Sequence, residues 1–158
     1  MAVGAIVLAL GGKGGRRHRQ LGWVYVGAMT TVNVTAFLIY RLFGTFGPFH
    51  VAAVISLTGI VVGTWVARRA RAARLARNPH RRAGLIESHY WWMTFSYAGL
   101  IAAFASETIT RYDALRAVVM ANAGFGAAVG IATAVVTTVS AIWIVRVRRA
   151  ALAPFAPR

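Results

Sequence analysis

The chain has 158 residues, of which 58% are hydrophobic and only 13% charged, whereas soluble domains carry roughly 25% charged residues. It contains no cysteine, which excludes disulfide bonds, thiolate metal sites and thiol nucleophiles. The formal net charge is +15, but the basic residues form short blocks between long apolar runs instead of one continuous face, which argues against a nucleic-acid partner.

The first apolar segment, residues 2–10, ends at Gly11 and Gly12 and is too short to cross a bilayer. Twelve helical residues rise only about 18 Å. The segment also lacks the basic start of a signal peptide. We expect residues 1–12 to be the end of a longer helix lost to a wrong start codon, which would give the full protein a fifth span. A half-inserted segment and a helix packed on the bundle are the alternatives.

Four later apolar runs are long enough to span, because a helix needs about 20 residues to cross a hydrocarbon core of about 30 Å. They cover residues 21–42, 49–67, 89–109 and 117–145. The sequence therefore predicts an all-α fold. We expect one membrane domain, an integral bundle of four transmembrane helices preceded by the short apolar N-terminal segment.

The distribution of charge predicts how these spans are oriented. Fifteen of the 18 basic residues lie before the first span, between the second and third, or after the fourth. The opposite side holds only Arg41, Arg111 and Arg116. Since the cytoplasmic loops of membrane proteins are rich in Lys and Arg, we expect the basic side, including the C-terminus, to be cytoplasmic.

Small residues indicate where spans approach one another closely. Gly59 and Gly63 form a G-x-x-x-G motif in the second span, and Gly126 and Gly130 form another in the fourth. Such pairs allow helix backbones to pack tightly in a membrane, where burial of apolar surface alone does not drive association. The second and fourth spans are therefore expected to make close helix contacts.

Two histidines stand at the cytoplasmic ends of spans that run in the same direction. His18 precedes the first span and His89 begins the third. At similar depth on parallel helices, their imidazoles are candidate ligands for a b-type haem or a metal ion. Glu87 is a candidate hydrogen-bond acceptor for one of these rings. The alternative is that both are polar residues at the membrane boundary; His80, in the basic loop, is expected to be solvated.

A second group of chemically capable residues falls on the outer side. His50 begins the second span, Glu107 ends the third, and Arg41 and Arg111 are near in the sequence. An ion pair of Glu107 with either arginine would avoid an isolated charge in the bilayer. His50 and Glu107 are alternatively candidate ligands for a metal ion, or groups in a proton relay. In the middle of the first span, Asn33 is expected to hydrogen-bond another helix.

Motifs of the common enzyme classes are missing from the sequence. It has no phosphate-binding glycine loop, no H-E-x-x-H and no G-x-S-x-G. Only three acidic residues are present, which disfavours hydrolysis by paired carboxylates. The residues therefore favour a non-enzymatic protein.

Several short motifs follow one another over about residues 13–111. In order they are Lys13-Gly14, residues 18–25 (HRQLGWVY), residues 46–50 (FGPFH), Ser88-His89-Tyr90 through Tyr97, Glu107-Thr108 and Arg111. As a set they resemble a family of bacterial predicted membrane proteins, domain of unknown function 2306. The resemblance implies a multi-span protein of the bacterial inner membrane and implies no activity. At its matching positions it directs attention to His18, His50, His89 and Glu107.

Two functions are compatible with these features. The first is an inner-membrane protein without a cofactor, such as an assembly factor or small transport component, acting with a membrane-protein partner or as a homo-oligomer. The second is a membrane redox protein that binds haem or metal through His18 and His89. The sequence alone favours the first in its broad form. Bound haem or metal would establish the second.

Overall fold

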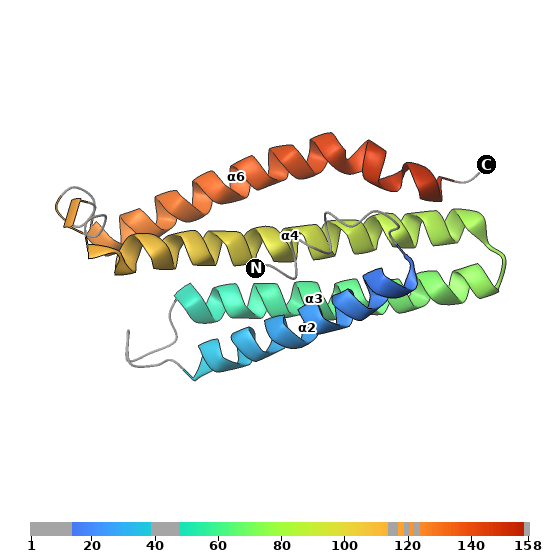
Figure 1. Cartoon of the computed structure of the whole chain (residues 1–158), viewed down its shortest axis with the longest axis horizontal. Coiled ribbons are helices and arrows are strands. Elements are labelled where there is room, and N and C mark those ends of the chain that lie inside the picture. The colour runs from blue at the N-terminus through green and yellow to red at the C-terminus, as the bar shows by residue number, and fades with distance from the viewer. Residues whose placement is uncertain (1–13, 39–47, 114–116, 119–120, 122–123, 157–158) are drawn as a thin grey trace.

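Four long helices make up the described part of the chain (Figure 1). The computed structural model describes residues 14–38, 48–113, 117–118, 121 and 124–156. The helices are α2 (Arg16–Phe37), α3 (Pro48–Leu75), α4 (Pro79–Arg111) and α6 (Gly124–Leu152), and α6 is followed by the 3₁₀ turn η1 (Ala153–Phe155). No strand occurs among these residues. The structure thus confirms the predicted all-α class.

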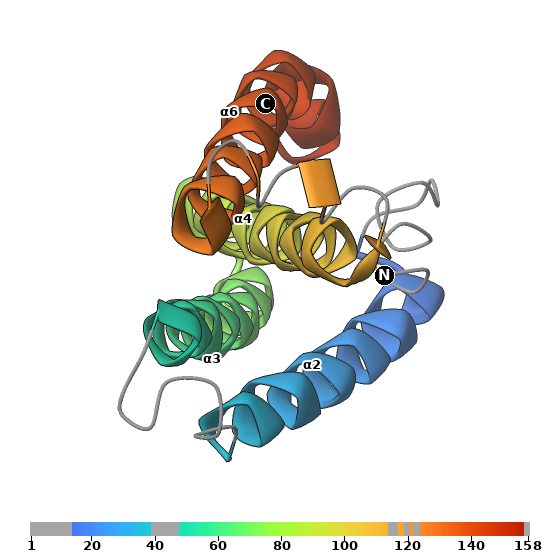
Figure 2. The ribbon, with the colours of Figure 1, turned by 90° about the vertical axis from the view of Figure 1, so that its left-hand side faces the viewer.

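Neighbouring helices in the bundle are also neighbours in the sequence. The helix α3 packs between α2 and α4, and α4 packs between α3 and α6. In Figure 1, α2 and α4 run in one direction, and α3 and α6 run in the other. As Figure 2 shows, α2 crosses the others obliquely.

A short turn reverses the chain between α3 and α4. Arg77 adopts the left-handed conformation with φ of 52°, and Asn78 caps α4 by accepting a hydrogen bond of 3.0 Å from the backbone N–H of Arg81. Pro79 follows as the first helical residue, where its missing N–H leaves no bond unmade. The helix α4 therefore begins ten residues before the apolar run that starts at residue 89. Hydropathy marks only the apolar run, whereas the helix also includes the polar residues before it.

The described parts of the three basic blocks lie at the same end of the bundle. In Figure 1 this is the end where α2 and α4 begin and where α3 and α6 finish. Among the described residues, two helices are long and apolar enough to cross a membrane, over His50–Leu75 and Val129–Phe155. Of the other two expected spans, residues 89–109 fall within α4, whereas α2 covers the first only as far as Phe37. Residues 39–42 of that span and residues 1–12 lie outside the described part of the chain.

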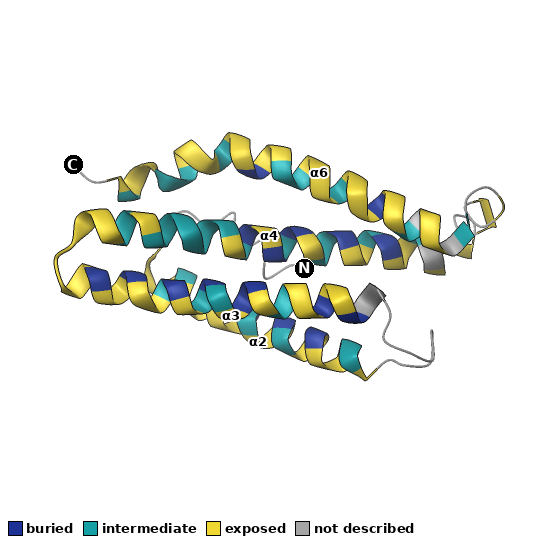
Figure 3. Cartoon of the chain, turned by 180° about the vertical axis from the view of Figure 1, so that it is seen from behind, coloured by how far each residue is buried: buried dark blue, intermediate teal, exposed yellow. Residues whose placement is uncertain are grey.

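Burial is concentrated between α2, α3 and α4. The core consists of Tyr25, Met29 and Ile60, with Val26, Met93, Tyr97 and Leu100 packed against it. Much of the surface of α6 is exposed (Figure 3). Its exposed apolar residues include Ile131, Val135, Val139, Ile142 and Val145. Such a continuous apolar surface is unusual for a protein in water and suits one whose solvent is lipid.

The two G-x-x-x-G motifs have different surroundings. A Cβ atom on Gly63 would lie 2.8 Å from Sδ of Met93 and 3.2 Å from Cβ of Trp92, so α3 and α4 are in close contact there. The prediction is confirmed for this span. Around Gly126 and Gly130, by contrast, no atom of the described chain lies within 4 Å of such a Cβ. Contrary to expectation, these two glycines mediate no close contact within the described part of a single chain.

Candidate cofactor site

The ring of His89 is held by the backbone of the neighbouring helix. Its Nδ1 lies 2.9 Å from the carbonyl oxygen of Gly63 on α3. Because a carbonyl oxygen can only accept a hydrogen bond, Nδ1 is the donor. In the neutral ring, Nε2 then carries the lone pair that can bind a metal centre. This bond fixes both the tautomer and the orientation of the imidazole.

The local sequence explains why this bond forms. Gly63 presents no side chain, and Met93 and Trp92 of α4 fill the space that a Cβ would occupy. The two backbones approach closely enough for His89, one turn before Met93, to reach a carbonyl of α3. The sequence interpretation missed Gly63 as the hydrogen-bond partner of the candidate ligand His89. Its signal was present in the G-x-x-x-G motif, which was assigned only to helix packing.

A second interhelical bond fixes the relative height of α2 and α4. The hydroxyl groups of Tyr25 and Ser96 lie 2.9 Å apart, and these residues are 71 positions apart in the sequence. His18 and His89 are also 71 positions apart, because His18 precedes Tyr25 by seven residues and His89 precedes Ser96 by seven residues. Seven residues are close to two helical turns and a rise of about 10 Å. Helical geometry therefore predicts the two histidines at similar heights, on the faces that bring Tyr25 and Ser96 together.

The membrane side of this level is closed by packed side chains. Tyr25 and Ser96 are buried, and the Tyr25 ring meets that of Tyr97 edge-on with centroids 6.4 Å apart. Met29 and Ile60 pack beyond them in the core. The His18 side chain is partly exposed at the opposite, basic end. A ligand between the histidines would thus lie at the basic end, separated from the outer end by apolar packing.

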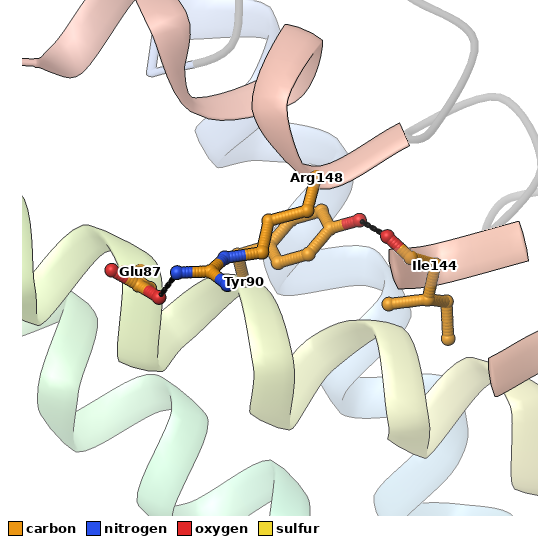
Figure 4. Close-up of polar contacts among 4 residues, drawn as sticks. All are labelled: Glu87, Tyr90, Ile144 and Arg148. Atoms are coloured by element: carbon orange, nitrogen blue, oxygen red, sulfur yellow. Dashed lines mark hydrogen bonds and ion pairs between the residues drawn. The ribbon is translucent and has the colours of Figure 1, made fainter. Parts of the chain in front are cut away.

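Glu87 does not take the role expected for it. It forms an ion pair with Arg148 near the end of α6, in the arrangement drawn in Figure 4. Beside it, the Tyr90 hydroxyl donates a hydrogen bond of 2.7 Å to the carbonyl of Ile144. These contacts attach α6 to α4. The acceptor for His89 is consequently the Gly63 carbonyl rather than the Glu87 carboxylate.

His50 and Glu107, at the end of the bundle opposite the basic blocks, have different environments. His50 is buried, with 1% of its surface exposed, and its ring centroid lies 6.2 Å from that of Phe37. Glu107 has 58% of its side chain exposed and forms the expected ion pair with Arg111 at 2.7 Å. Arg41, the alternative partner, lies outside the described residues. The ion pair of Glu107 is with Arg111, and the joint binding of a metal ion by His50 and Glu107 stays a prediction.

Among the described residues, no histidine lines the depression beside Glu107, whereas Asn33 bonds to a neighbouring helix. Glu107 borders an open depression of about 310 Å³ whose lining contains no histidine; the other lining residues are Phe104, Thr108, Arg111 and Tyr112. The amide of Asn33 donates to the Ser56 hydroxyl at 3.1 Å, which confirms the predicted interhelical bond. In the described part of the chain, no three metal-ligating side chains are grouped together.

Comparison with known proteins gives one match. The profile of the family described as "Predicted membrane protein (DUF2306)" matches residues 1–147. The searches of curated proteins and of solved structures found no match.

Proposed function

The chain belongs to the DUF2306 family of predicted membrane proteins, and we propose that it is a bacterial inner-membrane electron carrier that binds a b-type haem between His18 and His89. The placement in the membrane is part of the proposal. The chain crosses four times, through α2, α3, α4 and α6, and its basic end, with the C-terminus, faces the cytoplasm.

The observation that carries the proposal is the bond between Nδ1 of His89 and the Gly63 carbonyl. Metal-ligating histidines almost always donate their other ring N–H to a carbonyl, carboxylate or water, which orients the ring and raises its basicity. His18 supports the proposal by its position. It lies at the same level on a parallel helix, on the face that points toward α4 at Tyr25.

A haem fits this pair of residues better than a single metal ion does. Structural zinc sites use four protein ligands and catalytic ones three, and no group of three candidates exists among the described residues. A haem would need only two ligands from the protein, which matches the pair His18 and His89.

The two imidazoles would determine the chemistry. A haem held by both His18 and His89 would supply electron transfer, since both of its protein ligands would be histidines and neither would be replaced by a substrate. His18 and His89 would hold the haem, and the Gly63 carbonyl would orient the His89 ring. The packed side chains of Tyr25 and Met29 would keep water from reaching the haem through the bundle. This role agrees with a sequence that contains no motif of a hydrolytic enzyme.

The test is an absorption spectrum of the detergent-purified protein from cells supplied with haem, oxidised and then reduced with dithionite. We expect a Soret band and sharp bands on reduction, both lost in His18→Ala and in His89→Ala. The matched control is His80→Ala, an exposed histidine in the first turn of α4, which should keep the spectrum. Metal analysis of the same samples distinguishes iron from another metal ion.

Two results would overturn the proposal. A well-folded, colourless and metal-free protein would favour an assembly factor or small transport component without a cofactor. A spectrum retained in both single variants would place the ligands elsewhere. In that case His50→Ala tests the outer histidine.

A further inference from the structure

The basic end of the bundle carries much more positive charge than the chain can neutralise. Thirteen described arginines lie there: Arg16, Arg17, Arg19, Arg68, Arg69, Arg71, Arg74, Arg77, Arg81, Arg82, Arg146, Arg148 and Arg149. The chain has only three acidic residues, and two of them, Glu107 and Asp113, belong to the opposite end. The third, Glu87, is paired with Arg148. The remaining charge must be balanced by anions from outside the protein.

Two of these arginines are oriented by tryptophan rings. The guanidinium of Arg68 lies 5.4 Å from the ring centroid of Trp23 on α2, and that of Arg69 lies 4.0 Å from the centroid of Trp65 on α3. Stacking on a ring face holds a guanidinium without using its N–H groups. Both arginines are exposed, and their N–H groups suit bidentate binding of a phosphate oxygen pair.

Their depth in the bilayer follows from the length of α3. Arg68 is 20 residues from Pro48, where α3 begins on the outer side, which corresponds to about 30 Å. That distance equals the thickness of the hydrocarbon core, so Arg68 and Arg69 emerge at the level of the lipid headgroups. Trp23 and Trp65, both about half exposed, are residues that favour this interfacial zone. Arg71 and Arg74 continue the helix into solvent.

We propose that Arg68 and Arg69, oriented by Trp23 and Trp65, form a binding site for the phosphate of phosphatidylglycerol in the cytoplasmic leaflet. An anionic lipid supplies the missing negative charge, whereas a zwitterionic headgroup brings its own ammonium group. The indole rings also provide apolar surface for the glycerol and the first methylenes. The proposal rests on the membrane placement given above and is independent of the haem.

The test measures lipid affinity by native mass spectrometry of the protein released from detergent. The probes are phosphatidylglycerol, phosphatidylethanolamine with the same acyl chains, inorganic phosphate and a short RNA. We expect phosphatidylglycerol to bind on the order of tenfold more tightly than phosphatidylethanolamine. The double variant Arg68→Gln/Arg69→Gln should lose on the order of tenfold in this affinity.

The matched control is Arg71→Gln/Arg74→Gln, which removes the same charge from exposed arginines of the same helix. It should lose no more than about threefold, since its charges lie beyond the headgroups. Equal losses of affinity for phosphatidylglycerol in the two double variants would mean that the lipid responds to the overall positive charge and not to a specific site, which would overturn the proposal. Equal binding of the two lipids would also overturn it. Competition by inorganic phosphate at similar affinity would assign the site to free phosphate, and tighter binding of RNA would assign it to nucleic acid.

Discussion

The contact at Gly63 offers the sharpest test of the packing between α3 and α4. In Gly63→Ala the new methyl carbon would lie 2.8 Å from Sδ of Met93 and 3.2 Å from Cβ of Trp92. The end of the Met93 side chain can rotate away. Cβ of Trp92 is attached directly to the backbone of α4, however, so relief requires the two helices to separate by a few tenths of an ångström.

The expected change in the free energy of unfolding of Gly63→Ala combines two opposing effects. Overpacking a tight contact costs about 1–3 kcal/mol, while replacing a helical glycine by alanine contributes about 0.5–1 kcal/mol in favour of the helix. We therefore expect the variant to be less stable by roughly 1–2 kcal/mol. The matched control is Gly59→Ala, whose Cβ would meet Trp92 and Ser96 at ordinary contact distances of 3.8 and 3.9 Å. The control should equal or exceed the wild type in stability.

Thermal unfolding in one detergent, followed by tryptophan fluorescence, compares the two variants. A loss of about 1–2 kcal/mol corresponds to a fall in Tm of roughly 2–8 °C for a chain of this size. If haem is bound, the separation should also lengthen the bond from His89 and alter the reduced spectrum in Gly63→Ala alone. Equal Tm values for the two variants would refute the close contact between α3 and α4.

Three further substitutions test other interhelical contacts. Tyr90→Phe removes the hydrogen bond to Ile144 and should cost about 0.5–1.5 kcal/mol in thermal unfolding; an unchanged Tm would show that the hydroxyl is solvated instead. Glu87→Gln removes the ion pair with Arg148, whose members are 38% and 44% exposed, and should cost at most about 1 kcal/mol at low salt. This loss should disappear in high salt, and its persistence there would contradict an ionic cause. Asn33→Leu removes a buried bond to α3 and should lower stability in detergent by about 0.6–1.7 kcal/mol; a rise in Tm would indicate that the amide is poorly satisfied in the bundle.

The sequence predicted the helices because hydropathy and charge are properties of single residues. That His18 and His89 share a level stays a prediction, which rests on the two spans that return the chain to the same side between them. Helix ends were less predictable. Hydropathy marks where a bilayer ends, but α3 and α4 continue through arginine-rich segments and stop only at the turn formed by Arg77 and Asn78.

The partners of the candidate site were harder to predict. Glu87 was close to His89 in sequence, but the fold brings Arg148 from α6 against it, 61 residues away. The acceptor that His89 does use is a backbone carbonyl, and every residue has one. Nothing in the residue type of Gly63 distinguishes its carbonyl from the others. Only the close approach of the helix backbones makes it accessible to an imidazole.

The position of Gly63 on α3 also constrains what a haem at this site would do. Gly63 is five residues before Arg68, or about 8 Å along the helix, so the His89 ring lies just inside the headgroup level proposed for Arg68 and Arg69. The outer end of α3, at His50, is 13 residues away, or about 20 Å. Between these levels lies the packed core of Tyr25, Met29 and Ile60. A haem held by His18 and His89 would therefore exchange electrons with a partner at the basic end of the bundle, where the surrounding arginines favour an acidic donor or acceptor.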